Sequence, residues 1–223
     1  MENPSHCVKF WWRNILNINN FWPESEMCAA WSWYLANDFQ FFCLSPAFLI
    51  LIGTFAPLAW VLLVSTIIAS WISIVWMIDH HPIGTTDFDV LYDKPWTRIP
   101  PYLIGLATGV LIVKLDTVPG VKTLRTCLYA LLGWLTASAL ALSVVYGVYH
   151  AHITGPDLAS PLGKLNTSLS RSAWSLSLAW VTLACVMGWG GPVDWILSLP
   201  PLRFTRSSIW VIDKPESKVP SLI

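Results

Sequence analysis

Long apolar stretches separated by short polar segments dominate this chain, and their lengths predict helices that cross a membrane. A bilayer core about 30 Å thick needs about 20 apolar helical residues to span it. The stretches 55–78 and 126–149 carry no Asp, Glu, Lys or Arg, and 29–53 carries only Asp38. The pattern predicts an all-α polytopic membrane helix bundle with five spans, over residues 29–53, 55–78, 99–113, 126–149 and 173–191.

The third predicted span, 99–113, is the shortest, but basic residues flank it at both ends. Arg98 precedes it and Lys114 follows it. Long basic side chains at helix ends can extend toward the two membrane interfaces, so a short apolar stretch can still cross. We therefore count it as a span.

Polar segments frame a predicted membrane domain of residues 29–198. The lead, 1–28, contains Pro23–Glu26, where proline and acidic residues predict a turn and the start of a helix. The tail, 199–223, is basic and rich in proline, and we expect it to be disordered. Between spans two and three, Asp79–Pro101 reads as a polar connection, and 150–172 reads as a polar loop.

The composition supports a membrane protein. Hydrophobic residues make up 55% of the chain, charged residues only 12%, and the mean hydropathy is +0.56. Soluble domains carry about a quarter charged residues. Several of the fifteen Trp lie at predicted helix ends, as in the aromatic belts of membrane proteins. The net charge is zero, which argues against a nucleic-acid partner.

Basic residues and two further features predict the orientation. Five spans put the termini on opposite sides, and the side with the C-terminus holds seven Lys and Arg against six. Asn166-Thr167-Ser168, an N-glycosylation acceptor, lies on the six-charge side, as do Cys7 and Cys28, which could form a disulfide in the lumen. The alternatives are an unused acceptor and two free thiols. We expect a lumenal or extracellular N-terminus and a cytoplasmic C-terminus, in the plasma membrane or an endomembrane.

Asn37, Asp38 and Gln40 form a polar cluster in the first span. They cover an arc of about 160° of the helix. A carboxylate at a bilayer-centred position costs roughly 2.5–3.5 kcal/mol, so such residues face the bundle interior or a wet cavity. One interpretation is a pocket that binds a head group or relays a proton. The other is an interhelical hydrogen-bond cluster, or a span that places Asp38 near the surface.

Two other patterns suggest weaker hypotheses. Asp79-His80-His81, with Asp87 and Asp89 nearby, matches no established zinc spacing, so we predict a solvated acidic loop and no metal site. The paired small residues Gly105 and Gly109 would let another helix approach closely, unless they are incidental.

Two segments resemble a known family. Trp31-Ser-Trp-Tyr-Leu-Ala-Asn-Asp38 and Lys94-Pro-Trp-Thr-Arg98-Ile-Pro-Pro-Tyr102 are similar to motifs of the animal nose-resistant-to-fluoxetine branch of the type 3 membrane acyltransferases. A looser match runs from Ser172 to Trp195. The resemblance covers about residues 7–198.

The resemblance implies transfer of an acyl group, from a donor such as acyl-CoA, to a hydroxyl of a lipid or sugar. An Arg and a His on an early span carry this chemistry in the wider family, and we find no counterpart here, so we expect a partial chain whose catalytic residues are unknown. The residues nominated for a substrate cavity are Asn37, Asp38, Gln40, Lys94 and Arg98. Arg98 would meet an anionic group, or it would simply snorkel to the interface.

Three functions stay open at this point. The chain is part of an acyltransferase, a lipid or small-molecule transport protein, or a non-catalytic truncated isoform that pairs with a full-length relative. Its expected surroundings are membrane lipids, and we expect no bound cofactor.

The predicted orientation can be tested through Asn166. Glycosidase treatment should change the gel mobility of the wild-type chain but not that of Asn166→Gln, because the acceptor lies on the lumenal side. Unchanged mobility of both proteins would contradict this orientation.

Overall fold

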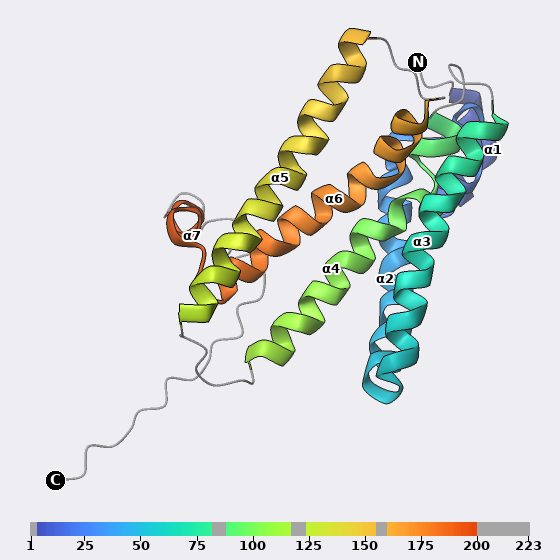
Figure 1. The fold of residues 1–223 in the computed structure, drawn as a ribbon. Helices are drawn as coiled ribbons and strands as arrows, with labels where there is room; N and C mark the ends of the chain where they lie inside the picture. Colours follow the sequence, from blue (N-terminus) through green and yellow to red (C-terminus); the bar gives the residue numbers. More distant parts are fainter. Residues whose placement is uncertain (1–3, 82–87, 117–123, 155–159, 200–223) are drawn as a thin grey trace. The chain divides into compact units, whose positions relative to one another are not determined.

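The computed structural model describes residues 4–81, 88–116, 124–154 and 160–199, and all regular structure in these ranges is helical (Figure 1). The predicted disordered segment from residue 200 onward, and Asp87, lie outside them. The longer helices are α1 (Pro4–Ile15), α2 (Trp33–Thr54), α3 (Ala56–His80), α4 (Pro95–Asp116), α5 (Leu124–Thr154), α6 (Pro161–Val186) and α7 (Gly191–Leu197). The single-turn helices are η1 (Asn19–Phe21), η2 (Glu24–Glu26), η3 (Ala30–Ser32) and the π-helix η4 (Phe88–Tyr92).

Four of the described helical segments are long and apolar enough to cross a membrane, and a bent pair supplies a fifth if it is one span. This confirms the expected all-helical, multi-pass membrane protein. The four segments are Ala30–Thr54, Ala56–His80, Asp89–Leu115 and Leu128–Gly147. The bent pair is α6 with α7, which differ in direction by 86°.

The chain forms two compact units, residues 1–181 and 182–223. In the described part of the second unit, α6 ends and a short break leads into α7. Gly188 in this break has a φ of +75°, a left-handed conformation that glycine adopts without steric cost.

Helices α2, α3 and α4 pack against one another in the first unit (Figure 1). Only Phe55 separates α2 from α3, so the two form a helical hairpin. The Ser70 hydroxyl on α3 donates a hydrogen bond of 2.6 Å to the carbonyl of Trp96 on α4. Trp71 Nε1 donates to the Ser172 hydroxyl on α6 at 2.9 Å. These polar contacts fix α3 against both neighbours, because hydrocarbon offers no competing partner.

Two predicted segments differ from the structure. Residues 161–172 are helical rather than a loop, because Ser160 Oγ accepts a hydrogen bond from the Gly163 N–H at 3.0 Å and Pro161 occupies the first helical position. Helix α4 begins at Pro95, four residues before the predicted span, because proline is also favoured at the first position of a helix. Asn166 therefore lies on α6.

The turn predicted at Pro23–Glu26 is present, but the helix that starts there is only one turn long. The chain makes only the short helix η2 there, and α2 begins at Trp33. The residues between form the η3 turn, in which the Ser32 hydroxyl donates to the carbonyl of Ala29 at 2.7 Å. The lead thus enters the first span through turns rather than through one continuous helix.

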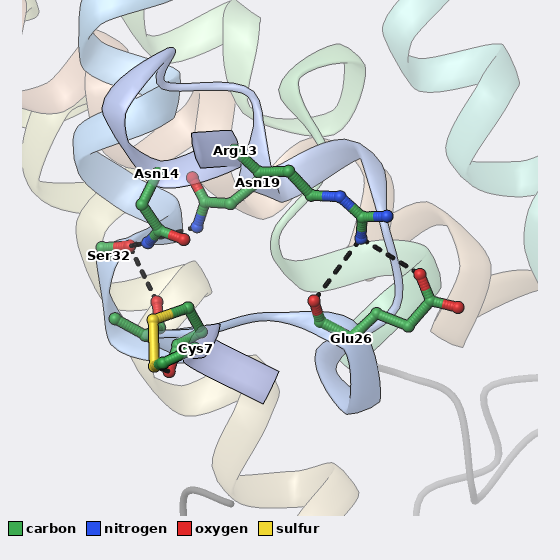
Figure 2. Close-up of a disulfide and its surroundings, with 8 residues drawn as sticks. Cys7, Arg13, Asn14, Asn19, Glu26 and Ser32 are labelled. Atoms are coloured by element: carbon green, nitrogen blue, oxygen red, sulfur yellow. Dashed lines mark hydrogen bonds and ion pairs between the residues drawn. A yellow bond between two sulfur atoms is a disulfide. The ribbon is translucent and has the colours of Figure 1, made fainter. Parts of the chain in front are cut away.

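A disulfide and polar contacts hold the lead together (Figure 2). Cys7 on α1 is bonded to Cys28, before η3. Arg13 forms an ion pair of 3.0 Å with Glu26, while Asn14 and Asn19 donate to the Ser32 hydroxyl at 2.6 and 3.1 Å. These contacts join α1 to the segment that precedes α2.

Two glycines make a matched test of helix packing. A Cβ at Gly133 on α5 would meet the ring of Trp180 on α6, whereas a Cβ at Gly105 on α4 would meet nothing within 4 Å. We expect Gly133→Ala to lower the free energy of unfolding by about 1–3 kcal/mol through overpacking. Gly105→Ala should cause no loss, since alanine favours helices over glycine by about 1 kcal/mol. Thermal unfolding in detergent, followed by circular dichroism, measures both. Equal effects would contradict this account of α5 and α6.

Candidate functional site

The polar residues of the first span divide between two places. Asn37 and Gln40 point toward the lead segment, whereas Asp38 lies on a different side of α2 and is exposed. The first two join an inner polar cluster, which we define as Asn20, Asn37, Gln40, Asp93 and Lys94. Asp38 instead lines a pocket with Arg98.

Amide side chains connect the inner polar cluster. Asn20, which is fully buried, donates to Asn37 Oδ1 at 2.8 Å and to Gln40 Oε1 at 3.2 Å. Gln40 Nε2 donates in return to Asn20 Oδ1 at 2.8 Å and to the carbonyl of Asn17 at 2.7 Å. Asn37 Nδ2 donates to the carbonyl of Asp93 at 2.9 Å. The network therefore joins the lead, α2 and the segment before α4.

A buried ion pair forms the charged part of the cluster. Lys94 Nζ lies 3.1 Å from Asp93 Oδ2 and also donates to the carbonyls of Asn20, at 2.9 Å, and Trp22, at 3.3 Å. Asp93 is fully buried and Lys94 is 7% exposed. Burying two charges is costly unless they are paired and hydrogen-bonded. Lys94 meets that condition through the lead's own backbone.

Asp38 and Arg98 share a pocket of about 400 Å³ between α2 and α4, which we call the Arg98 pocket. Its charged members come from different helices, the carboxylate from α2 and the guanidinium from α4. The complete lining is Trp33, Tyr34, Asn37, Asp38, Phe41, Arg98, Pro101 and Tyr102.

Backbone and aromatic contacts fix the Arg98 guanidinium. Nε donates to the carbonyl of Tyr92 at 2.6 Å, and Cζ lies 4.3 Å from the centre of the Tyr92 ring and 4.9 Å from that of Trp33. Cation–π contacts of this kind hold a guanidinium plane in place. Nη2 is buried and has no hydrogen-bond acceptor in the described part of the chain. The guanidinium is thus positioned but not neutralised by a carboxylate.

The Asp38 carboxylate is not neutralised either. The described residues contain three ion pairs, and none of them includes Asp38 or Arg98. Two opposite charges therefore line one pocket without pairing with each other. Asp38 does not lie in the bundle interior. Helix α2 buries Asn37 and leaves Asp38 exposed.

A second, apolar groove of about 490 Å³ lies between the lead, α2 and the start of α4. Phe41, which borders both cavities and is only 5% exposed, separates them. The lead, α2 and α4 all contribute to it, through Leu16, Asn17, Ile18, Phe21, Phe39, Gln40, Phe41, Cys43, Leu44, Pro95, Trp96 and Ile99. This groove was not predicted from the sequence, although apolar residues such as Leu16 and Ile18 follow α1.

Arg171 on α6 is a further basic residue that the sequence analysis did not single out. Its Nη1 donates to the carbonyl of Thr97 and its Nη2 to that of Leu91, each at 3.1 Å. Thr97 Oγ1 donates to the same Leu91 carbonyl at 3.0 Å. Arg171 therefore ties α6 to the start of α4, next to the Arg98 pocket. Its only sequence signal was a basic residue close to a predicted span.

The remaining nominated residues lie away from the pocket. Gly105 and Gly109 face open space, so close packing there would need a helix from outside the described chain. The Asn166 side chain lies beside Gly147 on α5. Asp79 pairs with Lys164, and the described residues hold no group of three or more potential metal ligands.

The fold and its charged pocket define a multi-pass helical membrane protein. Its sequence is 30% identical, over 217 aligned residues and 86% of this chain, to Nose resistant to fluoxetine protein 6 of Caenorhabditis elegans. It is also 27% identical to Regulator of hypoxia-inducible factor 1 of the same nematode, over 115 aligned residues and 41% of this chain. The chain is therefore a homologue of the nose-resistant-to-fluoxetine proteins, as its motifs predict.

The chain spans about a quarter of the length of these curated relatives, 26% of the first and 23% of the second. No family model matches the chain, and no solved structure matches it.

The buried pair makes a direct prediction about stability. Lys94→Met should lower the free energy of unfolding by about 3–5 kcal/mol, because it leaves the Asp93 carboxylate buried and unpaired. The matched control is Lys164→Met, which breaks the more exposed pair with Asp79 and should cost no more than about 1 kcal/mol. Denaturant unfolding in detergent compares the two.

The double variant Asp93→Asn with Lys94→Met separates charge burial from packing. It should recover part of the loss, since no lone charge is left inside. If Lys94→Met and Lys164→Met lost equal stability, the inner polar cluster would not be buried as described.

Proposed function

We propose that this chain provides substrate binding in an acyl-transferring membrane protein, and that the Arg98 pocket receives the polar end of an amphiphilic substrate. The observation that supports this most is the pair of opposite charges, Asp38 and Arg98, which share a pocket without neutralising each other. A lone charge inside a protein pocket is costly unless it is paired or hydrogen-bonded. A ligand with polar groups would offset that cost.

The surroundings of the pocket suit an amphiphile. Exposed aromatic residues at the start of α2 and α4, such as Tyr34 and Trp96, and Trp31 in η3 just before α2, are typical of the interface between head groups and hydrocarbon. Further along α2 the exposed side chains are apolar, including Leu49 and Ile50. A substrate with a polar head in the pocket would therefore have its chain at the depth of the lipid tails.

Binding, rather than bond making, is the role that the pocket residues support. Acyl transfer to a hydroxyl needs a general base, usually His, within hydrogen-bond reach of that hydroxyl. The pocket lining contains a carboxylate and a guanidinium but no His. We propose that the base belongs to another part of the complete enzyme or to a full-length relative that pairs with this chain. The donor would be an acyl-CoA and the acceptor a lipid or sugar.

A transport function is the second candidate, and the exposure of Asp38 within a span favours it. Exposed carboxylates in spans line substrate and proton pathways. Uptake into vesicles that is lost in Asp38→Asn and does not depend on acyl-CoA would support transport over acyl transfer.

Photo-crosslinking in nanodiscs tests the binding site. With photoactivatable palmitoyl-CoA and a photoactivatable phospholipid as probes, we expect labelled peptides from residues 33–41 and 98–102. Arg98→Gln should reduce the labelling by one of the probes by about tenfold or more, because hydrogen bonds to charged groups are worth roughly 1.5–3 kcal/mol.

The matched control is Asp79→Asn, since Asp79 lies near the end of α3 and does not line the pocket. It should label like the wild type. Labelling by both probes that is unchanged in Arg98→Gln and in Asp38→Asn would contradict the proposed site.

A further inference from the structure

We infer that the Arg98 pocket recognises a zwitterionic phospholipid head group, with an ammonium group beside Asp38 and a phosphate beside Arg98. This inference rests on the proposed binding function and names the class of its ligand. The lining of the pocket contains one carboxylate, that of Asp38, and one guanidinium, that of Arg98, so the net charge of the pocket is zero.

A zwitterion satisfies both charges, whereas a singly charged head group satisfies only one. A purely anionic head group would pair with Arg98 but would bring like charge to Asp38. A purely cationic one would pair with Asp38 and be repelled by Arg98. Because the two side chains do not form an ion pair with each other, no existing contact has to break for a bridging ligand to enter.

The carboxylate half of the pocket suits an ammonium group. Tyr34 and Asp38 lie one turn apart on α2, so their side chains share a face of the helix. The rings of Phe41 and Tyr102 lie 5.3 Å apart, centre to centre, and line the same cavity. Aromatic faces with a carboxylate nearby are the usual surroundings of bound quaternary ammonium groups.

The guanidinium half suits a phosphate. Tyr92 and Trp33 hold the Arg98 plane, and Nε donates a hydrogen bond to the Tyr92 carbonyl. The buried Nη2 has no acceptor among the described residues. Phosphate oxygens accept from two guanidinium nitrogens at once, which would satisfy this group.

Saturation-transfer NMR tests the inference on the full chain in a maltoside detergent. The probe is dihexanoylphosphocholine below its micelle concentration, and irradiation of the aromatic protons is read out at its trimethylammonium protons. We expect transfer in the wild type and in Asp79→Asn, and about tenfold weaker binding in Asp38→Asn, in line with the loss of one charge contact.

Competition between two lipids distinguishes a failure of the zwitterion proposal from a failure of the proposed binding function. Dihexanoylphosphoglycerol, which has the same chains and no ammonium group, should compete about tenfold less well than the phosphocholine lipid. Equal competition, or transfer unchanged in Asp38→Asn, would overturn the zwitterion but leave a lipid site at Arg98. Binding of neither lipid would overturn the proposed function as well.

Discussion

The buried Lys94–Asp93 pair is the contact on which the rest of this end of the molecule depends. Lys94 Nζ donates a hydrogen bond to a backbone carbonyl of the lead and forms an ion pair with the buried Asp93 carboxylate. Two buried charges in this position are tolerated only while they stay paired with each other. The lead, α2 and the start of α4 are therefore linked, and displacing one of them exposes or isolates a charge in the others.

This linkage decides which polar residues remain available for a ligand. Asn37 and Gln40 are used in joining the lead to α2, so their amides are occupied. Asp38, one position further along the helix than Asn37, is exposed, and its carboxylate has no ion-pair partner among the described residues. Arg98 is positioned by rings and one carbonyl rather than by a carboxylate. The start of α2 and the start of α4 thus contribute both to the inner polar cluster and to the Arg98 pocket.

Much of the architecture could be predicted from the sequence, because length and the absence of charge are local properties. The apolar stretch 55–78 lies in α3 except for Phe55, and the stretch 126–149 lies within α5. Helix starts were predicted less well. Ser160 and Pro161 begin α6 inside a stretch that looked like a loop, because capping chemistry outweighs a polar composition.

The candidate site was only partly predictable for a different reason. The polar pattern of the first predicted span, together with the family resemblance, identified Asn37, Asp38, Gln40, Lys94 and Arg98, and the structure places all of them at one end of α2 and α4. The lead distinguishes the inner polar cluster from the Arg98 pocket, because Asn20 bonds to Asn37 and the Trp22 carbonyl bonds to Lys94. These are tertiary contacts, and the local sequence carries no signal for them. Arg171 was missed because its partners are backbone carbonyls 74 and 80 residues away in the chain.

Amine labelling of the native chain tests the central claim most directly. A water-soluble acetylating reagent is added to the protein in detergent, and the modification of each lysine is followed by mass spectrometry. The account predicts that Lys94, at 7% exposure, reacts far more slowly than the exposed Lys9, and that the difference disappears on unfolding. Equal rates of modification at Lys94 and Lys9 in the folded protein would contradict it.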